Sequence, residues 1–395
     1  MSDANPEQWR LATRLVRGGL SRTPFCETSE ALFLNSGYVY DSAEESEESF
    51  DGTRQRFVYS RFRNPTVAMF EDRLALVEGA EACRATASGM AAVHAALVSQ
   101  VRAGDRVVAA RALFGSCRWI IGDLLPRFGV EVDFVDGADL DQWRAALAKP
   151  TRCVFIETPS NPTLELIDVT AVAELTHAAG GRLVVDNVFA TPILQKPLAL
   201  GADVVVYSAT KHIDGQGRCL GGAVLGSSAF VADVLGPYLR HTGPCLSPFN
   251  AWVLLKGLET LELRMARHVQ NAERIAALLD GHDQIARVLY PTLPSHPQHA
   301  LAARQMSGGG SIIAFEPKGG KERAYRLLNA LKLIDISNNL GDAKSLITHP
   351  WTTTHQSRSA EEKRGMGITE GLLRLSVGLE DCQDLSDDLV GALTA

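Results

Sequence analysis

The chain has 395 residues, of which 46% are hydrophobic and 22% are charged, and its formal net charge is −7. This length allows a large buried core and predicts two domains with a terminal arm. The negative charge and the lack of a clustered basic surface disfavour a nucleic-acid partner.

Several other classes of protein are also disfavoured. No apolar run approaches the roughly 20 residues that a membrane span needs, and the polar N-terminus MSDANPEQWR does not resemble a secretory signal. We therefore expect a soluble, cytoplasmic protein. Seven cysteines stand singly, without a CxxC pair, which disfavours a disulfide framework and a thiolate zinc site. His296 and His299 lie in a proline loop rather than on a helix, so we expect no metal.

The first third of the chain changes character near residue 65. Residues 1 to about 60 lack hydrophobic periodicity, and their acidic run DSAEESEESFD at 41–51 predicts a solvated or mobile segment. Apolar residues at helical spacing then predict a helix over 65–80. A Ser-Gly turn predicts the start of a second helix, over 88–101.

Short apolar runs rich in β-formers alternate with amphipathic helices from residue 105 to residue 226. This alternation is typical of βαβ units and predicts a mostly parallel sheet covered on both faces. The predicted strands are 105–110, 130–136, 152–158, 182–187, 203–210 and 221–226, with helices near 119–129, 140–148 and 169–180.

The last part of the chain predicts a separate, smaller unit. Apolar positions recur every three or four residues over 247–281 and predict one long helix leaving the sheet. A loop at 290–299 follows, and an α+β unit runs from about 308 to 381. We therefore expect an N-terminal arm over 1–62, a large domain over 63–260 and a small domain over 261–395.

Polar residues cluster where the predicted strands end, which is where parallel sheets bind their ligands. The run VVVYSATK ends in Ser208, Thr210 and Lys211. A lysine in this position usually reaches solvent, so a functional role for it has to be supported by the neighbouring residues. The Ser88-Gly89-Met90 turn opens a helix, whose free N–H groups and positive dipole end suit a phosphate.

These groups together match the chemistry of one cofactor. Ser208 and Thr210 could add hydroxyl donors to the phosphate, and Asp186 could pair with a protonated ring nitrogen. A phosphate, an amine-reactive carbonyl and a pyridine nitrogen all belong to pyridoxal 5'-phosphate (PLP). The sequence therefore predicts Lys211 as the Schiff-base lysine of a PLP enzyme.

Other motifs carry less weight. GQGRCLGG at 215–222 resembles a dinucleotide fingerprint, but its third glycine stands one place too late, which favours a flexible loop. The chain contains neither a GxxxxGK[ST] phosphate loop nor a G-x-S-x-G elbow. Nicotinamide binding, nucleotide hydrolysis and serine hydrolysis are therefore disfavoured.

Six ordered motifs closely resemble the Cys/Met-metabolism family of fold-type I PLP enzymes: YSRFRNPT, ASGMAAVHAAL, ETPSNPT, VVDNVFATP, YSATKHIDG and LLRLSVGLED. The resemblance runs from about residue 15 to 382. It implies an α/β fold of the aspartate aminotransferase type, with a mostly parallel seven-stranded sheet domain and a smaller C-terminal α+β domain. It also implies a homotetramer built from two catalytic dimers, with the arm reaching the neighbouring subunit.

The resemblance further implies a role for each residue at a matching position. Lys211 binds the cofactor aldehyde and shuttles protons, and Asp186 keeps the ring nitrogen protonated. Gly89 and Met90, next to Ser88, bind the phosphate through their backbone. Ser208 and Thr210 bind it through their hydroxyl groups. The resemblance also implies that Tyr59 and Arg61 of the neighbouring subunit bind the phosphate. It implies that Phe114 stacks on the cofactor ring and that Asn161 contacts the ring hydroxyl. Arg374 is expected to bind the substrate α-carboxylate, and Asn339 to lie near that carboxylate.

Two departures from the lyase pattern favour the sulfhydrylase branch, in which sulfide displaces the acid from an O-acyl-homoserine. Phe114 stands where lyases usually have a tyrosine, so a phenol that could act as an acid or base is missing. In SNNLGDAKSL, Asn339 replaces a serine and Lys344 a glutamate. The compact chain favours a succinyl over an acetyl ester of homoserine. The acetyl ester, cystathionine synthesis, a lyase, and a non-catalytic pyridoxal-binding regulator remain alternatives.

Overall fold

Short runs of small and β-branched residues build a seven-stranded sheet in the computed structural model, which describes residues 6–394. The strand order is β1-β7-β6-β5-β4-β2-β3. Strands β2 to β6 pair in parallel, and β7 runs antiparallel to both of its neighbours. The strands are β1 (Ala82–Thr86), β2 (Arg106–Ala110), β3 (Glu131–Val135), β4 (Cys153–Glu157), β5 (Arg182–Asp186), β6 (Val204–Ser208) and β7 (Gly222–Gly226).

The fold class predicted from the sequence is confirmed, but one strand is not among those predicted. Strand β1 has the sequence ACRAT, in which only the threonine is β-branched, so its β-propensity is low. It forms because it pairs antiparallel with β7 along its whole length, from Ala82 opposite Gly226 to Thr86 opposite Gly222. Pairing with a distant strand leaves no local signal.

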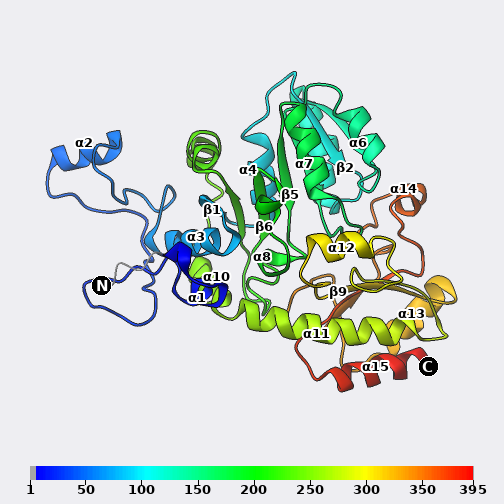
Figure 1. The fold of residues 1–395 in the computed structure, drawn as a ribbon. Helices are drawn as coiled ribbons and strands as arrows, with labels where there is room; N and C mark the ends of the chain where they lie inside the picture. Colours follow the sequence, from blue (N-terminus) through cyan, green and yellow to red (C-terminus); the bar gives the residue numbers. More distant parts are fainter. Residues whose placement is uncertain (1–5, 395) are drawn as a thin grey trace.

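Helices cover this sheet as Figure 1 shows for α4 and α7. The expected helices over 65–80, 88–101, 140–148 and 169–180 all form. The helix expected near 119–129 is irregular, with a wide turn followed by a tight one, because Pro126 lacks the N–H that a regular helix needs there. The elements are α3 (Pro65–Glu78), α4 (Gly89–Val98), α5 (Gly115–Trp119), η2 (Ile120–Leu124), η3 (Leu125–Phe128), α6 (Leu140–Ala146), α7 (Val169–Ala178), α8 (Thr191–Leu194), η4 (Pro197–Leu200), η5 (Phe230–Leu235) and α9 (Gly236–Thr242).

The single long helix expected over 247–281 is wrong, because two helices occupy this stretch. Helix α10 (Pro248–Glu259) ends at Thr260, whose backbone (φ −110°, ψ 5°) leaves the helical region, and α11 (Leu261–Asp280) then begins. The start of α11 packs in the core of the first sheet through Met265, and its end packs in a second core through Ile275. Helix α11 thus links the two sheets (Figure 1).

A second, five-stranded sheet of order β10-β11-β12-β9-β8 forms the C-terminal part of the described chain. Its buried face packs on α11, α13 and α15. The elements are β8 (Ile285–Leu289), α12 (His299–Gln305), β9 (Ile312–Pro317), α13 (Gly320–Ala330), β10 (Asp335–Ile336), β11 (Leu346–Thr348), α14 (Ala360–Gly365), β12 (Leu373–Ser376) and α15 (Cys382–Thr394). Among residues 6–394, no helix is both long enough and apolar enough to cross a bilayer.

The N-terminal segment contains η1 (Pro6–Gln8), α1 (Leu11–Arg17) and α2 (Ala43–Asp51). The acidic run is therefore helical over Ala43–Asp51, although it has no apolar periodicity that would predict a helix. The Ser42 hydroxyl accepts from the Glu45 N–H at the start of α2, and Gly52 ends the helix with φ 87°. Helix α2 lies away from both sheets (Figure 1). Residues 1–5 of the predicted arm and residue 395 of the predicted small domain lie outside the described residues.

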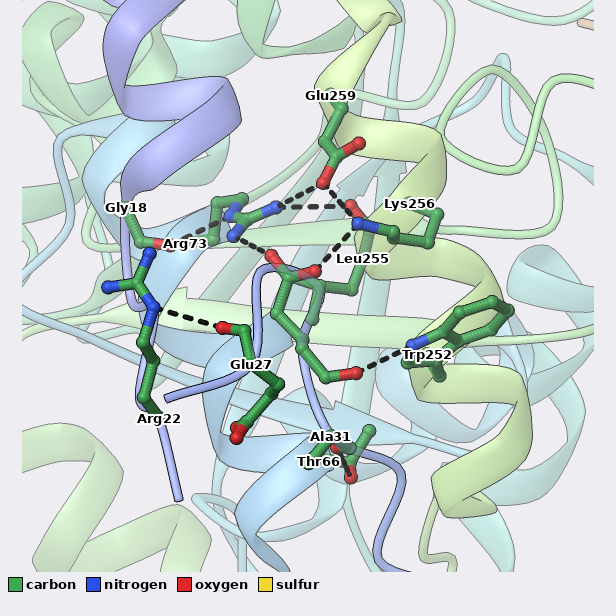
Figure 2. Close-up of polar contacts among 11 residues, drawn as sticks. Gly18, Arg22, Glu27, Ala31, Thr66, Arg73, Trp252, Leu255, Lys256 and Glu259 are labelled. Carbon is green, nitrogen blue, oxygen red and sulfur yellow. Dashed lines mark hydrogen bonds and ion pairs between the residues drawn. The ribbon is translucent and has the colours of Figure 1, made fainter. Parts of the chain in front are cut away.

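A cluster of buried and half-buried charges connects this segment to the large sheet region (Figure 2). Arg73 of α3 contacts the Glu30 carboxylate at 2.5 Å and donates to the Gly18 carbonyl at 2.7 Å. Lys256 of α10 contacts the other Glu30 oxygen at 2.7 Å and Glu259 at 2.6 Å. We call Glu30, Arg73, Lys256 and Glu259 the arm anchor. It joins the segment before α2 to both α3 and α10.

Candidate active site

A cavity of about 270 Å³ lies at the carboxyl ends of the parallel strands. Its walls come from the ends of β4, β5 and β6, the start of α4, the start of α5, and loops of the second sheet region. The predicted site residues that line it are Ser88, Gly89, Met90, Phe114, Asn161, Asp186, Ser208, Thr210, Lys211 and Arg374. Residues far apart in the sequence therefore meet where a parallel sheet is expected to bind its ligand.

One wall of the cavity is suited to a phosphate. Ser88 caps α4 by accepting from the Ala91 N–H, so the N–H groups of Gly89 and Met90 at the first turn have no acceptor within the helix. A Cβ on Gly89 would lie 2.5 Å from Cβ of Ser208, so only glycine lets β6 approach this helix end. Free N–H groups, the helix dipole and the adjacent Ser208 hydroxyl make a cradle for an anion.

A pair of buried carboxylates lies deeper in the cavity. Glu157 and Asp186 are register partners at the ends of β4 and β5. Burial raises the pKa of both groups, and their mutual repulsion raises that of Glu157 further. Glu157 accepts from the backbone N–H of Phe114 at 2.8 Å and of Asn161 at 2.7 Å, whereas Asp186 accepts from the Val188 N–H at 3.1 Å. Asp186 is therefore suited to pair with a cation, such as a protonated ring nitrogen.

Lys211 projects into the same cavity without a carboxylate partner among the described residues. Its Nζ donates to Oδ1 of Asn339 at 2.5 Å. Burial, and then the positive charge of Arg374, lower the pKa of Lys211 to about 8. A lysine with this pKa is partly neutral near neutral pH and can act as a nucleophile or base.

Arg374 of β12 enters the cavity from the second sheet and is only 1% exposed. Its guanidinium donates to Oδ1 of Asn161 at 3.0 Å and to the carbonyls of Asn338 and Asn339 at 2.8 and 3.2 Å. Its Nε is buried and has no hydrogen-bond partner within residues 6–394. Burial lowers the pKa of Arg374 to about 10, although Glu157 opposes this shift. The group stays charged and can bind a carboxylate.

Two predicted residues lie elsewhere. Tyr59 and Arg61 do not line this cavity in their own chain. Tyr59 is 39% exposed, and the Arg61 guanidinium lies 5.3 Å from the Tyr59 ring and 4.8 Å from the Phe62 ring. This position agrees with the expectation that they serve a neighbouring subunit, which stays a prediction. Asn339 is not part of the cavity wall but contacts Lys211 directly.

The structure also brings in residues that the sequence did not single out as site residues. Glu157 was visible as a polar residue at a strand end, in ETPSNPT, but only the register with Asp186 shows that the two carboxylates meet. No sequence signal marked three further residues that line the cavity: Cys117 in the short helix α5, and Asn338 and Thr354, which lie outside the helices and strands. Among residues 6–394, no three metal-ligating side chains gather in one place.

The arrangement fits PLP. The cradle at α4 can hold the phosphate, Asp186 can hold a protonated ring nitrogen, and Phe114 lies in the wall where a ring can stack. The partly neutral Lys211 can bond to the aldehyde. The orphaned Nε of Arg374 shows that this arginine still has a donor to give to a substrate.

Comparison with known proteins gives the same result. The family described as Cys/Met metabolism PLP-dependent enzyme matches residues 12–394. An O-succinylhomoserine sulfhydrylase of Mycobacterium tuberculosis is 56% identical, covering 99% of this chain and 97% of its own. An L-methionine gamma-lyase of Fusobacterium nucleatum subsp. polymorphum is 40% identical, covering 97% and 98%. A crystal structure from Campylobacter jejuni, named only provisionally as an O-acetylhomoserine (thiol)-lyase, contains N'-pyridoxyl-lysine-5'-monophosphate. It has a TM-score of 0.94 and 33% identity, covering 98% of this chain and 100% of that one.

Proposed function

Because the chain belongs to the Cys/Met metabolism family of PLP-dependent enzymes, we propose that it converts O-succinylhomoserine and sulfide to homocysteine and succinate. This γ-replacement is a step toward methionine. The observation that carries the proposal is the placement of a partly neutral Lys211 between an anion cradle, a buried acid and Arg374. The greater identity to the sulfhydrylase than to the lyase supports the choice within the family.

When bound, PLP supplies an aldehyde that captures the substrate amine and a protonated ring that withdraws electrons from the α-carbon. The chain's own residues do the rest. Asp186 keeps the proton on the ring nitrogen, and the cradle at α4 holds the phosphate in place. Arg374 binds the substrate α-carboxylate through its planar fork of donors and thereby orients the α-proton. Lys211, with its neutral amine, would remove that proton and then a β-proton, so that the γ-carbon–oxygen bond can break and succinate can leave, and would return both protons after sulfide has added.

Phe114 supports replacement over elimination. It lines the cavity but carries no phenol, so it can pack on a ring but cannot move a proton. In this proposal, proton transfer rests on Lys211. Sulfide is small and needs no second amino-acid site, whereas cystathionine formation would need room for cysteine.

Product identification by mass spectrometry tests the proposal. The purified, PLP-loaded protein is given O-succinylhomoserine or O-acetylhomoserine, each with sulfide or with cysteine. We expect homocysteine from the succinyl ester with sulfide and little cystathionine from any mixture. Cystathionine as the main product would make the protein a cystathionine γ-synthase. A preference for the acetyl ester would make it the acetyl homologue, and release of α-ketobutyrate without a sulfur donor would make it a lyase.

We also propose that two copies of the chain complete each other's sites and that two such dimers form a tetramer in the cytoplasm. Tyr59 and Arg61 lie outside the cavity, and the segment around them exposes large apolar side chains, including Phe25 at 92% and Val39 at 87%. Mixed oligomers test this directly. A Lys211→Ala chain and an Arg61→Ala chain, each with little activity, should together regain activity, because one shared site then contains both native residues. Lack of any recovery in mixed oligomers would refute the shared site.

A further inference from the structure

The substrate in the proposed function carries a second carboxylate, at the far end of its succinyl group. Arg374 is assigned to the α-carboxylate, so another cation must recognise this end if the enzyme prefers the succinyl ester. The acetyl ester lacks the group. The inference below therefore rests on the proposed function and concerns how the cavity distinguishes the two esters.

The loop after β11 brings a basic residue to the rim of the cavity. Thr354 lines the cavity, and its carbonyl lies 3.6 Å from the position that a Cβ on Gly115 would take. Four residues later, Nη2 of Arg358 donates to the Gly115 carbonyl at 3.4 Å. Gly115 follows Phe114, which is itself part of the wall. The Arg358 guanidinium is thus next to the rim formed by α5 and this loop.

The positive charge at this rim is compensated only at a distance, because the carboxylates of Glu362 and Asp123 act on Arg118 without forming an ion pair with it among the described residues. Glu362 is the one carboxylate in contact with Arg358 among the described residues, and their nearest atoms are 3.8 Å apart. Arg118 of α5 packs over the Phe134 ring at 4.1 Å. Its Nη1 is buried and has no hydrogen-bond partner in residues 6–394. Donors that lack partners in this way are the ones that an anionic ligand satisfies.

The same loop connects this rim to the inner arginine. His355 is 2% exposed, and its Nδ1 lies 2.9 Å from the Thr354 hydroxyl. Burial, followed by the positive charges of Arg374, Arg358 and Lys363, lowers the pKa of His355 to about 4. His355 is therefore neutral near pH 7 and lies within the electrostatic range of both arginines.

We propose that Arg358, supported by Arg118, binds the terminal carboxylate of the succinyl group while Arg374 binds the α-carboxylate. Arg358, in the loop after β11, and Arg374, in β12, then bind the two ends of a single substrate. The guanidinium fork of Arg358 is suited to a carboxylate, and its partial burial strengthens the interaction relative to an exposed pair. After the γ-carbon–oxygen bond breaks, the leaving succinate keeps this contact until it departs through the rim.

The test compares the two esters in the PLP-loaded enzyme. In Arg358→Ala, kcat/KM for O-succinylhomoserine with sulfide should fall at least about tenfold, mainly through KM. The value for O-acetylhomoserine should fall less than about threefold. Arg358→Lys, which keeps the charge but not the fork, should lie between. The matched control is Arg364→Ala on α14, an exposed arginine whose nearest carboxylate, on Glu370, is 3.9 Å away; it should leave the ratio unchanged.

A binding measurement separates this inference from the proposed function. Succinate and butyrate are titrated against the PLP-loaded protein, with cofactor absorbance as the signal. Native protein should bind succinate more tightly, and Arg358→Ala should lose this difference. An unchanged ratio in both assays, or an equal fall for both esters, would overturn the carboxylate site while leaving the proposed reaction intact. Failure of the native enzyme to turn over either ester would instead refute the proposed function, and the succinate titration would still test Arg358.

Discussion

The arm anchor and the active-site cavity both bury acidic and basic side chains, but they treat these charges in opposite ways. In the arm anchor, each Glu30 oxygen contacts a cation, Arg73 or Lys256. Burial alone would raise the pKa of Glu30, yet the hydrogen bonds from Lys256 and Arg73 outweigh it and lower the pKa. The charges compensate each other, so this cluster has a structural role.

In the cavity, by contrast, no direct pair joins an acid to a base among the described residues. Lys211 and Arg374 contact amide and carbonyl oxygens, and Glu157 and Asp186 face each other. All four pKa values shift toward the neutral form. Such shifts cluster at functional sites, because the missing partner is a ligand. The comparison indicates that the arm anchor stabilises the fold. The cavity, in contrast, contains ionisable groups without ion-pair partners, which are available to bind PLP and substrate.

The largest expected effect is on activity alone. Lys211→Ala should abolish turnover, with a loss of at least about 10⁴-fold, because it removes both the covalent link and the acid–base group. The visible absorbance of the lysine-bound cofactor should disappear, while the unfolding temperature of the cofactor-free protein should not fall. Turnover that persists in purified Lys211→Ala protein would refute the assigned role.

Breaking the arm anchor should lower stability, whereas the Lys211 substitution should lower activity. Arg73→Met leaves Glu30 buried with one cation, and the free energy of unfolding should fall by about 3–5 kcal/mol. Denaturant unfolding measures this loss. The exposed pair Arg144 and Asp141 provides the control, because Arg144→Ala should cost less than about 1 kcal/mol. A stability loss no larger than that of the control would show that the arm anchor is dispensable.

Removing Arg374, the proposed partner of the substrate α-carboxylate, should raise KM. Arg374→Ala should weaken apparent substrate binding by about 2–5 kcal/mol, because the α-carboxylate then loses a buried, charged, two-point partner. Arg374→Lys keeps a charge without the fork and should recover only part of this loss. Steady-state kinetics with O-succinylhomoserine measure both, and an unchanged KM in the alanine variant would contradict the carboxylate assignment.

The smallest effect is expected for Glu157, which acts through its neighbours. Glu157→Gln can accept only one of the two backbone N–H bonds from Phe114 and Asn161 well, so kcat/KM should fall about tenfold. It also removes a carboxyl group that titrates next to Asp186, so the pH profile of the cofactor absorbance should shift. Glu78→Gln is the matched control, since Glu78 is also buried with a pKa raised to about 7 but lies outside the cavity wall. Identical pH profiles in both variants would leave Glu157 with a packing role only.

Much of the cavity could be predicted from the sequence, because its residues follow apolar strands in recognisable motifs. Lys211, Asp186 and the Ser88 turn all stand at element ends whose chemistry is readable locally. The other features of the site depend on how segments that are remote in sequence meet in space. The meeting of Glu157 with Asp186 depends on strand register, and Thr354 and Arg358 reach the rim through an irregular loop without periodicity. Strand β1 forms only because of β7, and the break at Thr260 interrupts an apolar repeat that continues through it.

The most direct test of the comparison is the free energy of unfolding between pH 4 and pH 7, with and without PLP. Burial raises the pKa of Asp186 from 3.8 to about 7, so in this window the native, cofactor-free protein binds a proton that the unfolded chain has lost. The contribution of Asp186 to stability should therefore fall as pH rises. A protonated ring nitrogen beside Asp186 keeps its carboxylate ionised, so this pH dependence is removed. The difference in stability between loaded and cofactor-free protein should thus grow with pH, and grow less in Asp186→Asn. A difference with the same pH dependence in both proteins would contradict the claim that the cavity holds Asp186 unpaired for the cofactor.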